Sequence, residues 1–280
     1  RLLVALILAR LLTPAEFGIA AEVLVFSSFI VVFADAAFGA ALIQRENLTE
    51  DDRSTAFWAS VVIGLVLTAV GVLAAGPIAN FYGEPQVEPL LRAMSAGFLL
   101  TSLGAIQEAL LTREMAWRTL ELRLMLATVL GAVVGISTAL AGWGAWAIIL
   151  QSLTVIVASS AILWIRSPWR PELRFSKTSL VEMGSFSAYV FGHRLLYYAH
   201  RNADNLLIGK FVGAAALGAY AIAYNIILVP FSRIAVPIQD VLFPAFARLQ
   251  TDLARIADAW IRAMRMVGAI TVPSLVGLAI

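Results

Sequence analysis

Long apolar runs alternate with short polar stretches along the whole sequence. A bilayer-spanning helix needs about 20 mostly apolar residues. The pattern therefore predicts an incomplete span at residues 2–12 and further spans at residues 17–43, 54–75, 87–111, 122–141, 143–165, 184–211, 217–246 and 260–280. All should be helices, because an isolated strand cannot satisfy its backbone hydrogen bonds in lipid. The alternating ten-residue segments typical of membrane barrels are absent from the sequence.

The composition agrees with a membrane protein. Of the 280 residues, 61% are apolar and 14% are charged, and the mean hydropathy is +0.88. Soluble domains carry about 45–50% apolar and about 25% charged residues, and a soluble fold of this size has no core large enough for the surplus. The excess apolar surface should face lipid, which predicts an all-α polytopic membrane protein.

Several kinds of chemistry are disfavoured. The chain has no cysteine and two histidines, so disulfides cannot form and neither a thiolate nor a histidine metal site is expected. A net charge of +2 predicts no nucleic-acid partner. We find no catalytic constellation and no phosphate-binding P-loop, which argues against an enzyme and against direct ATP coupling.

Basic residues gather in every second connection between spans. The connections at residues 44–53, 112–123, 166–183 and 247–265 carry thirteen arginines and lysines. Only Arg10, Arg92 and Lys210 lie near the other connections, at residues 13–16, 76–86, 142 and 212–216. Connections rich in lysine and arginine stay in the cytoplasm. The first group is therefore predicted to be cytoplasmic, together with the N-terminus.

A weak internal repeat links the two halves of the chain. Residues 8–20, LARLLTPAEFGIA, match residues 208–220, IGKFVGAAALGAY, at an offset of 200, which pairs Gly18 with Gly218. Six predicted spans lie between equivalent points, so the two copies run in the same direction. Such parallel repeats occur in transporters whose lobes are related by an axis along the membrane normal. We expect two parallel six-helix lobes around a central cavity.

The repeat also suggests the domain organisation. The basic segment at residues 166–183 is the predicted cytoplasmic linker between an N-lobe at residues 1–165 and the first half of a C-lobe at residues 184–280. The chain begins without methionine and ends inside an apolar run, so we expect a fragment of a protein with at least twelve spans. Within the N-lobe, the pattern Gly131-x-x-x-Gly135 predicts a close helix contact.

The stretch FGHRLLYYAHRNADN, residues 191–205, puts charged groups inside a predicted span. At about 100° per residue, two neighbouring ridges form on one side of the helix: His193, Tyr197, His200 and Asp204, and beside them Arg194, Tyr198, Arg201 and Asn205. Ionisable groups in a span normally face the bundle interior or a water-filled cavity, because exposure to lipid costs at least ~2.5–3.5 kcal/mol each. We therefore expect this helix to line an aqueous cavity.

The predicted cavity face is cationic on balance, and guanidinium groups match phosphate with paired hydrogen bonds. Candidate substrate-binding residues are Arg194, Arg201, Arg233, Asn205 and Asn225. Candidate ion-coupling residues are Asp204, His193, His200, Asp35 and Glu22. Structural alternatives remain open: an ion pair of Arg201 with Asp204, an ion pair of Arg233 with Asp35, and simple packing of the histidines.

Several motifs carry a resemblance to a known family: LARLLTPAEFG, ALIQRENLTEDDRSTAFW, PIANFYGEPQ, NADNLLIGKFVGAAALGAYAIAYN and FPAFARLQ. They span the chain and keep the same order. On these motifs the chain resembles the polysaccharide-exporter branch of the multidrug/oligosaccharidyl-lipid/polysaccharide flippase superfamily, and in particular its Wzx-type and teichuronic or colanic acid exporters. The stretch FADAAFGAAL departs from the pattern near Ala37, where a glycine is expected.

The resemblance implies a multi-pass flippase of the bacterial inner membrane. Such a protein moves undecaprenyl-pyrophosphate-linked oligosaccharide repeat units, for O-antigen or exopolysaccharide, to the periplasmic leaflet. It would need no cofactor beyond an H+ or Na+ gradient. Its partners would be the lipid-linked oligosaccharide, membrane lipids and glycan polymerase machinery.

Two other functions stay open at this point. A drug or cation antiporter of the same superfamily should place unpaired carboxylates in the cavity. A membrane glycan polymerase or ligase usually needs a large periplasmic loop, whereas the predicted outer connections are short.

Overall fold

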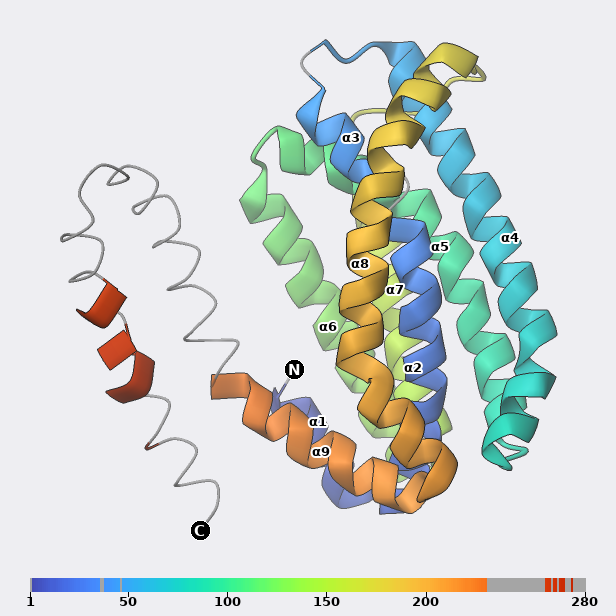
Figure 1. Cartoon of the computed structure of the whole chain (residues 1–280), viewed down its shortest axis with the longest axis vertical. Helices are drawn as coiled ribbons and strands as arrows, with labels where there is room; N and C mark the ends of the chain where they lie inside the picture. Colours follow the sequence, from blue (N-terminus) through green and yellow to red (C-terminus); the bar gives the residue numbers. More distant parts are fainter. Residues whose placement is uncertain are drawn as a thin grey trace. The chain divides into compact units, whose positions relative to one another are not determined.

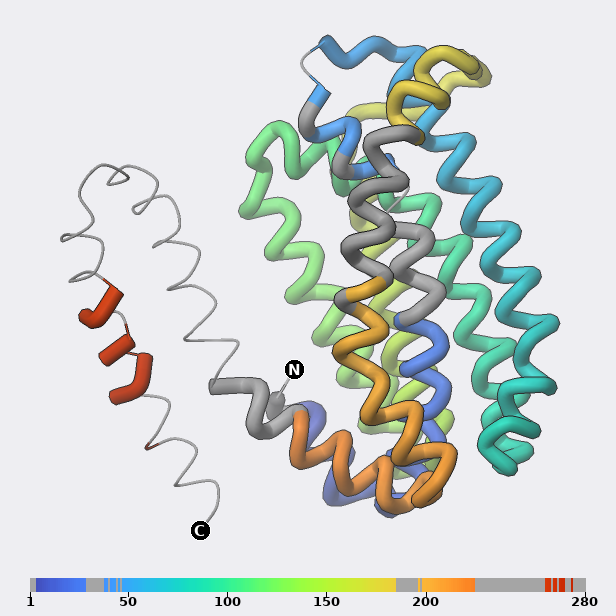
Figure 2. Tube along the Cα trace, viewed as in Figure 1, coloured from blue at the N-terminus to red at the C-terminus, as the bar shows by residue number. Residues whose placement is uncertain are grey.

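A computed structural model describes the backbone of residues 2–35, 38–45 and 47–230 and of a few residues between 260 and 273. Side chains are described for residues 4–28, 47–184 and 198–224 and for some others (coloured in Figure 2). Every regular element in this part of the chain is a helix: α1 (Leu2–Leu11), α2 (Pro14–Asp35), α3 (Gly39–Gln44), α4 (Glu50–Tyr82), α5 (Val87–Arg113), α6 (Trp117–Leu140), α7 (Trp146–Arg166), α8 (Lys177–Phe211) and α9 (Ala214–Pro230). The predicted all-α membrane fold is confirmed.

The chain forms two compact units, residues 3–219 with Arg1 and residues 220–280 with Leu2. The first unit includes the whole of α8, which packs against α2, α3 and α4. The helix begins at Lys177, so only residues 167–176 of the predicted linker are non-helical. The division into two six-helix lobes stays a prediction.

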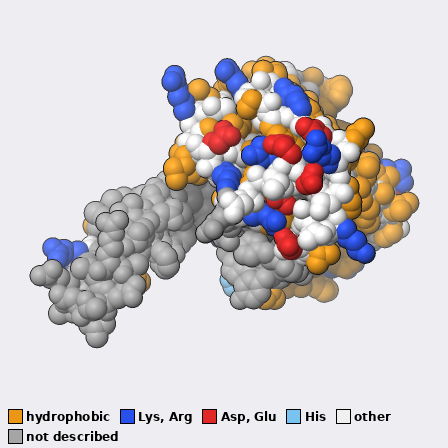
Figure 3. Space-filling view, turned by 90° about the horizontal axis from the view of Figure 1, so that it is seen from above, with side chains coloured by type: hydrophobic (Ala, Val, Ile, Leu, Met, Phe, Trp, Pro, Cys, Tyr) orange, Lys and Arg blue, Asp and Glu red, His pale blue; other side chains and the backbone are white. Residues whose placement is uncertain are grey.

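The connections of the first unit gather at two opposite ends of its helices (Figure 1). The α3–α4, α5–α6 and α7–α8 connections lie at one end, and the α1–α2, α4–α5, α6–α7 and α8–α9 connections lie at the other. This is the grouping that the basic residues predicted. Figure 3 looks onto the first end, where lysine and arginine side chains stand among acidic ones. We call it the basic end.

The surface of the first unit suits lipid. Within the described residues, α4, α5, α6 and α7 are long and apolar enough to cross a membrane. Large apolar side chains point away from the protein along them; Leu73 of α4 is 78% exposed and Leu140 of α6 is 70% exposed. Water would make so much exposed hydrocarbon costly, whereas a bilayer would not.

Small residues bring neighbouring helices together. A Cβ atom added at Gly131 of α6 would lie 2.9 Å from the backbone oxygen of Gln151 in α7, and one added at Gly135 would lie 2.9 Å from the Cβ atom of Gln151. The close contact predicted from this glycine pair is confirmed. Gly64 and Gly71 of α4 meet serines of α5 in the same way, which is how membrane helices replace the hydrophobic driving force with tight packing.

Candidate functional site

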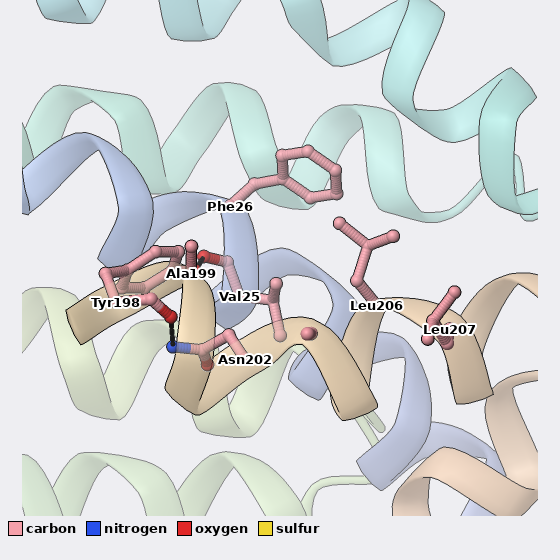
Figure 4. Close-up of a pocket in the computed structure, with 8 residues that line it drawn as sticks. Val25, Phe26, Tyr198, Ala199, Asn202, Leu206 and Leu207 are labelled. Carbon is pink, nitrogen blue, oxygen red and sulfur yellow. Dashed lines mark hydrogen bonds between the residues drawn. The ribbon is translucent and has the colours of Figure 1, made fainter. Parts of the chain in front are cut away.

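An apolar groove lies between α2 and the second half of α8. It has a volume of about 400 Å³ and is lined by Val25, Phe26, Tyr198, Ala199, Asn202, Ala203, Leu206 and Leu207. Figure 4 shows Val25 and Phe26 on α2 and the remaining labelled residues on α8. The small alanine side chains of α8 make room for the groove, and leucine side chains and the phenylalanine ring form its apolar walls.

Two polar groups of the groove are already hydrogen-bonded within the protein. The Tyr198 hydroxyl donates a hydrogen bond to the backbone oxygen of Val25. The Asn202 side-chain nitrogen donates to the backbone oxygen of Tyr198 over 3.1 Å, the dashed line in Figure 4. The first bond ties α8 to α2, the second lies within α8, and the rest of the groove surface is chiefly hydrocarbon. The groove therefore suits an alkyl or isoprenoid chain better than a charged headgroup.

The polar ridges predicted on α8 lie mostly outside this groove. Of their described members, Tyr198 alone lines it. His200 is exposed, and Arg201, Asp204 and Asn205 are half-buried. Asp204 accepts a hydrogen bond from the backbone nitrogen of Asn205 over 2.8 Å, and Arg201 also has an interaction partner. On the alanine and leucine side of α8, Ala199, Ala203 and Leu207 are exposed, and the aqueous cavity stays a prediction.

Several candidate side chains cannot be placed. The side chains of Asp35, His193, Arg194 and Asn225 lie outside the described residues, as does the whole of Arg233. Their predicted roles therefore stay predictions from the sequence.

A buried acid lies near the end of the bundle opposite the basic end. Glu22 of α2 is 0% exposed, and neither carboxylate oxygen has a hydrogen-bond partner. The buried hydroxyl of Tyr82, at the end of α4, also lacks a partner. The Tyr82 ring meets that of Phe26 edge-on, with centroids 5.8 Å apart, and Phe26 lies one helical turn after Glu22.

The sequence identified Glu22 but missed Tyr82. A charge inside an apolar run stands out, because its burial is costly. A tyrosine at the end of a span instead has the pattern of an interfacial anchor. Only the packing of α4 against α2 and α8 shows that Tyr82 points inward. An added Cβ atom at Gly209 of α8 would lie 2.7 Å from the Tyr82 ring.

Comparison with known proteins identifies the family. The family model described as "Polysaccharide biosynthesis protein" matches residues 7–280. The chain belongs to this family. No solved structure matches the chain.

Curated relatives align with most of the length of this chain. The teichuronic acid biosynthesis protein TuaB of Bacillus subtilis is 29% identical over 89% of this chain and 52% of its own length. The succinoglycan biosynthesis transport protein ExoT of Rhizobium meliloti is 27% identical over 97% of this chain and 55% of its own. The lipopolysaccharide biosynthesis protein WzxC of Escherichia coli is 25% identical over 97% of this chain and 56% of its own length. The chain spans about half the length of the curated relatives that it matches.

Proposed function

We propose that this chain is part of a flippase that moves undecaprenyl-pyrophosphate-linked oligosaccharide repeat units across the bacterial inner membrane by alternating access. The observation that carries the proposal is the family match over residues 7–280. One relative is named as a transport protein, and others are named for the biosynthesis of teichuronic acid and lipopolysaccharide. The protein would be a transporter and not an enzyme.

The chemistry of the chain suits such a substrate. A polyprenyl chain needs an apolar surface, and the groove between α2 and α8 is lined chiefly by hydrocarbon side chains. A pyrophosphate headgroup needs cations and amide donors, which Arg194, Arg201, Arg233, Asn205 and Asn225 would supply. An H+ or Na+ gradient would drive transport, with Asp204, His193, His200, Asp35 and Glu22 as candidate coupling groups.

Deletion of the gene for the full protein tests the proposal. The strain should accumulate lipid-linked repeat units on the cytoplasmic face of the inner membrane and should lose the surface polysaccharide. The sidedness can be measured with a glycan-cleaving enzyme added to spheroplasts, which reaches only the periplasmic leaflet. Complementation with the intact gene should restore polymer, and intact lipid-linked units should then become sensitive to the enzyme.

Other outcomes would contradict the proposal and favour the alternatives. Single repeat units that accumulate on the periplasmic face would indicate a defect after transport, as expected for a glycan polymerase or ligase. Normal polysaccharide together with increased sensitivity to cationic drugs would indicate an antiporter.

A further inference from the structure

Two glycines, one from each copy of the internal repeat, contact the opposite copy. A Cβ atom added at Gly18 would overlap the backbone oxygen of Ala214, at the start of α9. One added at Gly218 would overlap the backbone oxygen of Pro14, at the start of α2. The contacts are reciprocal, because the offset of 200 pairs Pro14 with Ala214 and Gly18 with Gly218. We call these four residues the crossing.

The helix boundaries follow the same offset. α1 ends at Leu11 and α8 at Phe211, and α2 begins at Pro14 and α9 at Ala214. The side chain of Ala214 is buried in the apolar cluster of the first unit. Because backbone touches backbone on both sides, the crossing closes only with hydrogen as the side chain at positions 18 and 218.

Glu22 lies one turn beyond Gly18 on the same face of α2. It is fully buried, and both carboxylate oxygens lack a hydrogen-bond partner. An ionised carboxylate in such surroundings would carry a large desolvation cost with no compensating bond. The carboxyl group should therefore keep its proton while the crossing is closed.

No described basic group is placed to neutralise Glu22. Glu84, just after α4, is another acid and cannot neutralise it, and the phenol of Tyr82 is an uncharged group. Lys210 of α8 bonds instead to the backbone oxygen of Phe81.

The described residues of α5 and α7 place no unpaired charge at this end of the bundle. On α5, Glu88 and Arg92 form an ion pair with each other. The one ionisable residue of α7, Arg166, lies at the opposite, basic end of the bundle.

We propose that Glu22 is a proton-exchange site whose access to water is controlled by the crossing. While the contacts of Gly18 and Gly218 keep the crossing closed, the carboxyl group of Glu22 is neutral. When the crossing opens, the acidic O–H bond breaks, the proton passes to water at that end, and the carboxylate is solvated. This inference deepens the proposed function and rests on it. In a transporter, Glu22 would be the group through which a proton gradient favours either the closed or the open crossing.

Cysteine labelling of the full-length protein tests this directly. Any cysteine outside this chain is first replaced, since the chain itself has none. Ala214→Cys reports on the crossing, because Ala214 is 7% exposed. Ala215→Cys, at an exposed neighbouring position, corrects for the pH dependence of thiol chemistry. The measured quantity is the ratio of the two labelling rates with a membrane-impermeant maleimide, in intact cells across a range of pH.

Each variant has a distinct expected result. With Glu22 intact, the ratio should rise with pH by up to about ten-fold per unit while the group titrates, because one proton is linked to opening. Glu22→Gln, which is neutral and of equal size, should give a low and flat ratio. Gly18→Ala should give a high ratio at every pH. Gly76→Ala is the matched control, because its added Cβ atom would lie 3.7 Å or more from its neighbours.

Three outcomes would overturn the inference. The ratio could be flat in the parent, it could keep its pH dependence in Glu22→Gln, or it could stay low in Gly18→Ala. If Gly18→Ala does not accumulate, the Glu22→Gln comparison still decides, because that substitution changes no volume. Labelling requires no substrate, so a protein that behaves as expected here but exports no glycan would count against the proposed function alone.

Discussion

The indole nitrogen of Trp58 donates a hydrogen bond to the backbone oxygen of Glu172 over 2.8 Å. This bond joins α4 to the connection between α7 and α8. Beside it, the Ser54 hydroxyl accepts from the backbone nitrogen of Glu172 over 3.2 Å, and the Thr55 hydroxyl accepts from that of Ser176 over 2.8 Å. Any movement of α8 relative to α4 must therefore pivot about this attachment or break it.

Trp58→Phe should weaken the attachment between α4 and the α7–α8 connection without leaving a large cavity. The ring remains, but the indole donor is lost, which should cost about 0.5–1.5 kcal/mol. Trypsin should then cleave faster between Arg166 and Lys177 in the purified protein, as followed by gel electrophoresis. Trp143→Phe is the control, since Trp143 is 56% exposed at the opposite end. Equal cleavage rates for Trp58→Phe and the parent would show that the bond does not hold the connection.

Asp52 should stabilise the basic end far more than its neighbour Asp51. Asp52 is 1% exposed and forms a capping box with Thr49 at the start of α4. Its carboxylate lies 3.1 Å from the Arg45 guanidinium. Asp52→Asn should lower the free energy of unfolding by about 1–3 kcal/mol, measured as thermal stability in detergent. Asp51→Asn, at a position 55% exposed, should change it by less than about 0.5 kcal/mol.

The stabilisation that Asp52 provides should also depend on pH, and the direction of that dependence can be predicted. Asp52 precedes the predicted span. Burial by itself would raise the pKa of Asp52, but the Ser179 hydroxyl, the Thr49 backbone and side chain, and the charge of Arg45 together lower the pKa below its ordinary value of 3.8. The stabilisation should be fully present above that value and lost as the pH falls through the folded-state pKa. The gap between parent and Asp52→Asn should therefore narrow in acid, and a constant gap would count against this account.

Gly131→Ala should destabilise the contact between α6 and α7. The new methyl carbon would lie 2.5 Å from a Val155 methyl group and 2.9 Å from the Gln151 backbone oxygen, and the backbone atom cannot rotate away. Gly76→Ala, whose added Cβ atom would make only ordinary contacts with the Glu88 side chain, should be neutral or stabilising by up to about 1 kcal/mol, because alanine favours helix. Thermal unfolding of both variants in one detergent gives the comparison, and an equal shift for both would mean that the helices separate without cost.

The apolar pattern predicted where the helices cross the membrane but not where they end. α4 was expected at residues 54–75 and runs from Glu50 to Tyr82, and α8 was expected from residue 184 and begins at Lys177. The extra residues at the helix starts, EDDR in α4 and KTSLVEM in α8, include charged and hydroxyl side chains, so hydropathy does not detect them. Capping side chains define their starts instead: Thr49 for α4 and Ser176 for α8.

The candidate site was only partly predictable for a similar reason. Glu22 and the pair Gly18 and Gly218 were visible, because a buried charge and a repeated glycine break the local pattern. The groove was not visible, since it arises where Val25 and Phe26 of α2 meet the alanines of α8. A helical wheel shows that α8 has a polar and an apolar side, but it does not show which neighbour covers each one.

Arg194 is the cation on which the substrate-binding proposal depends most. Its side chain is outside the described residues, so the prediction rests on the sequence. A charge-assisted bond to phosphate contributes about 1.5–3 kcal/mol, so Arg194→Ala should weaken substrate handling roughly ten- to a hundred-fold. Arg194→Lys should restore it in part, because the charge remains and the paired donors are lost. Arg92→Ala, which removes an exposed cation, should export repeat units at the parental rate.

The sidedness of the two ends can be measured with single cysteines, because the chain has no cysteine of its own. Arg174→Cys lies at the basic end and Gln86→Cys at the other, and both positions are exposed. The excess of arginine and lysine at the first end predicts that it faces the cytoplasm. In intact cells, an impermeant maleimide should label position 86 and spare position 174 until the membrane is permeabilised. Labelling of position 174 alone would reverse the orientation and place the crossing and Glu22 on the cytoplasmic side. Labelling of both positions in intact cells would contradict the separation of the two ends by a membrane.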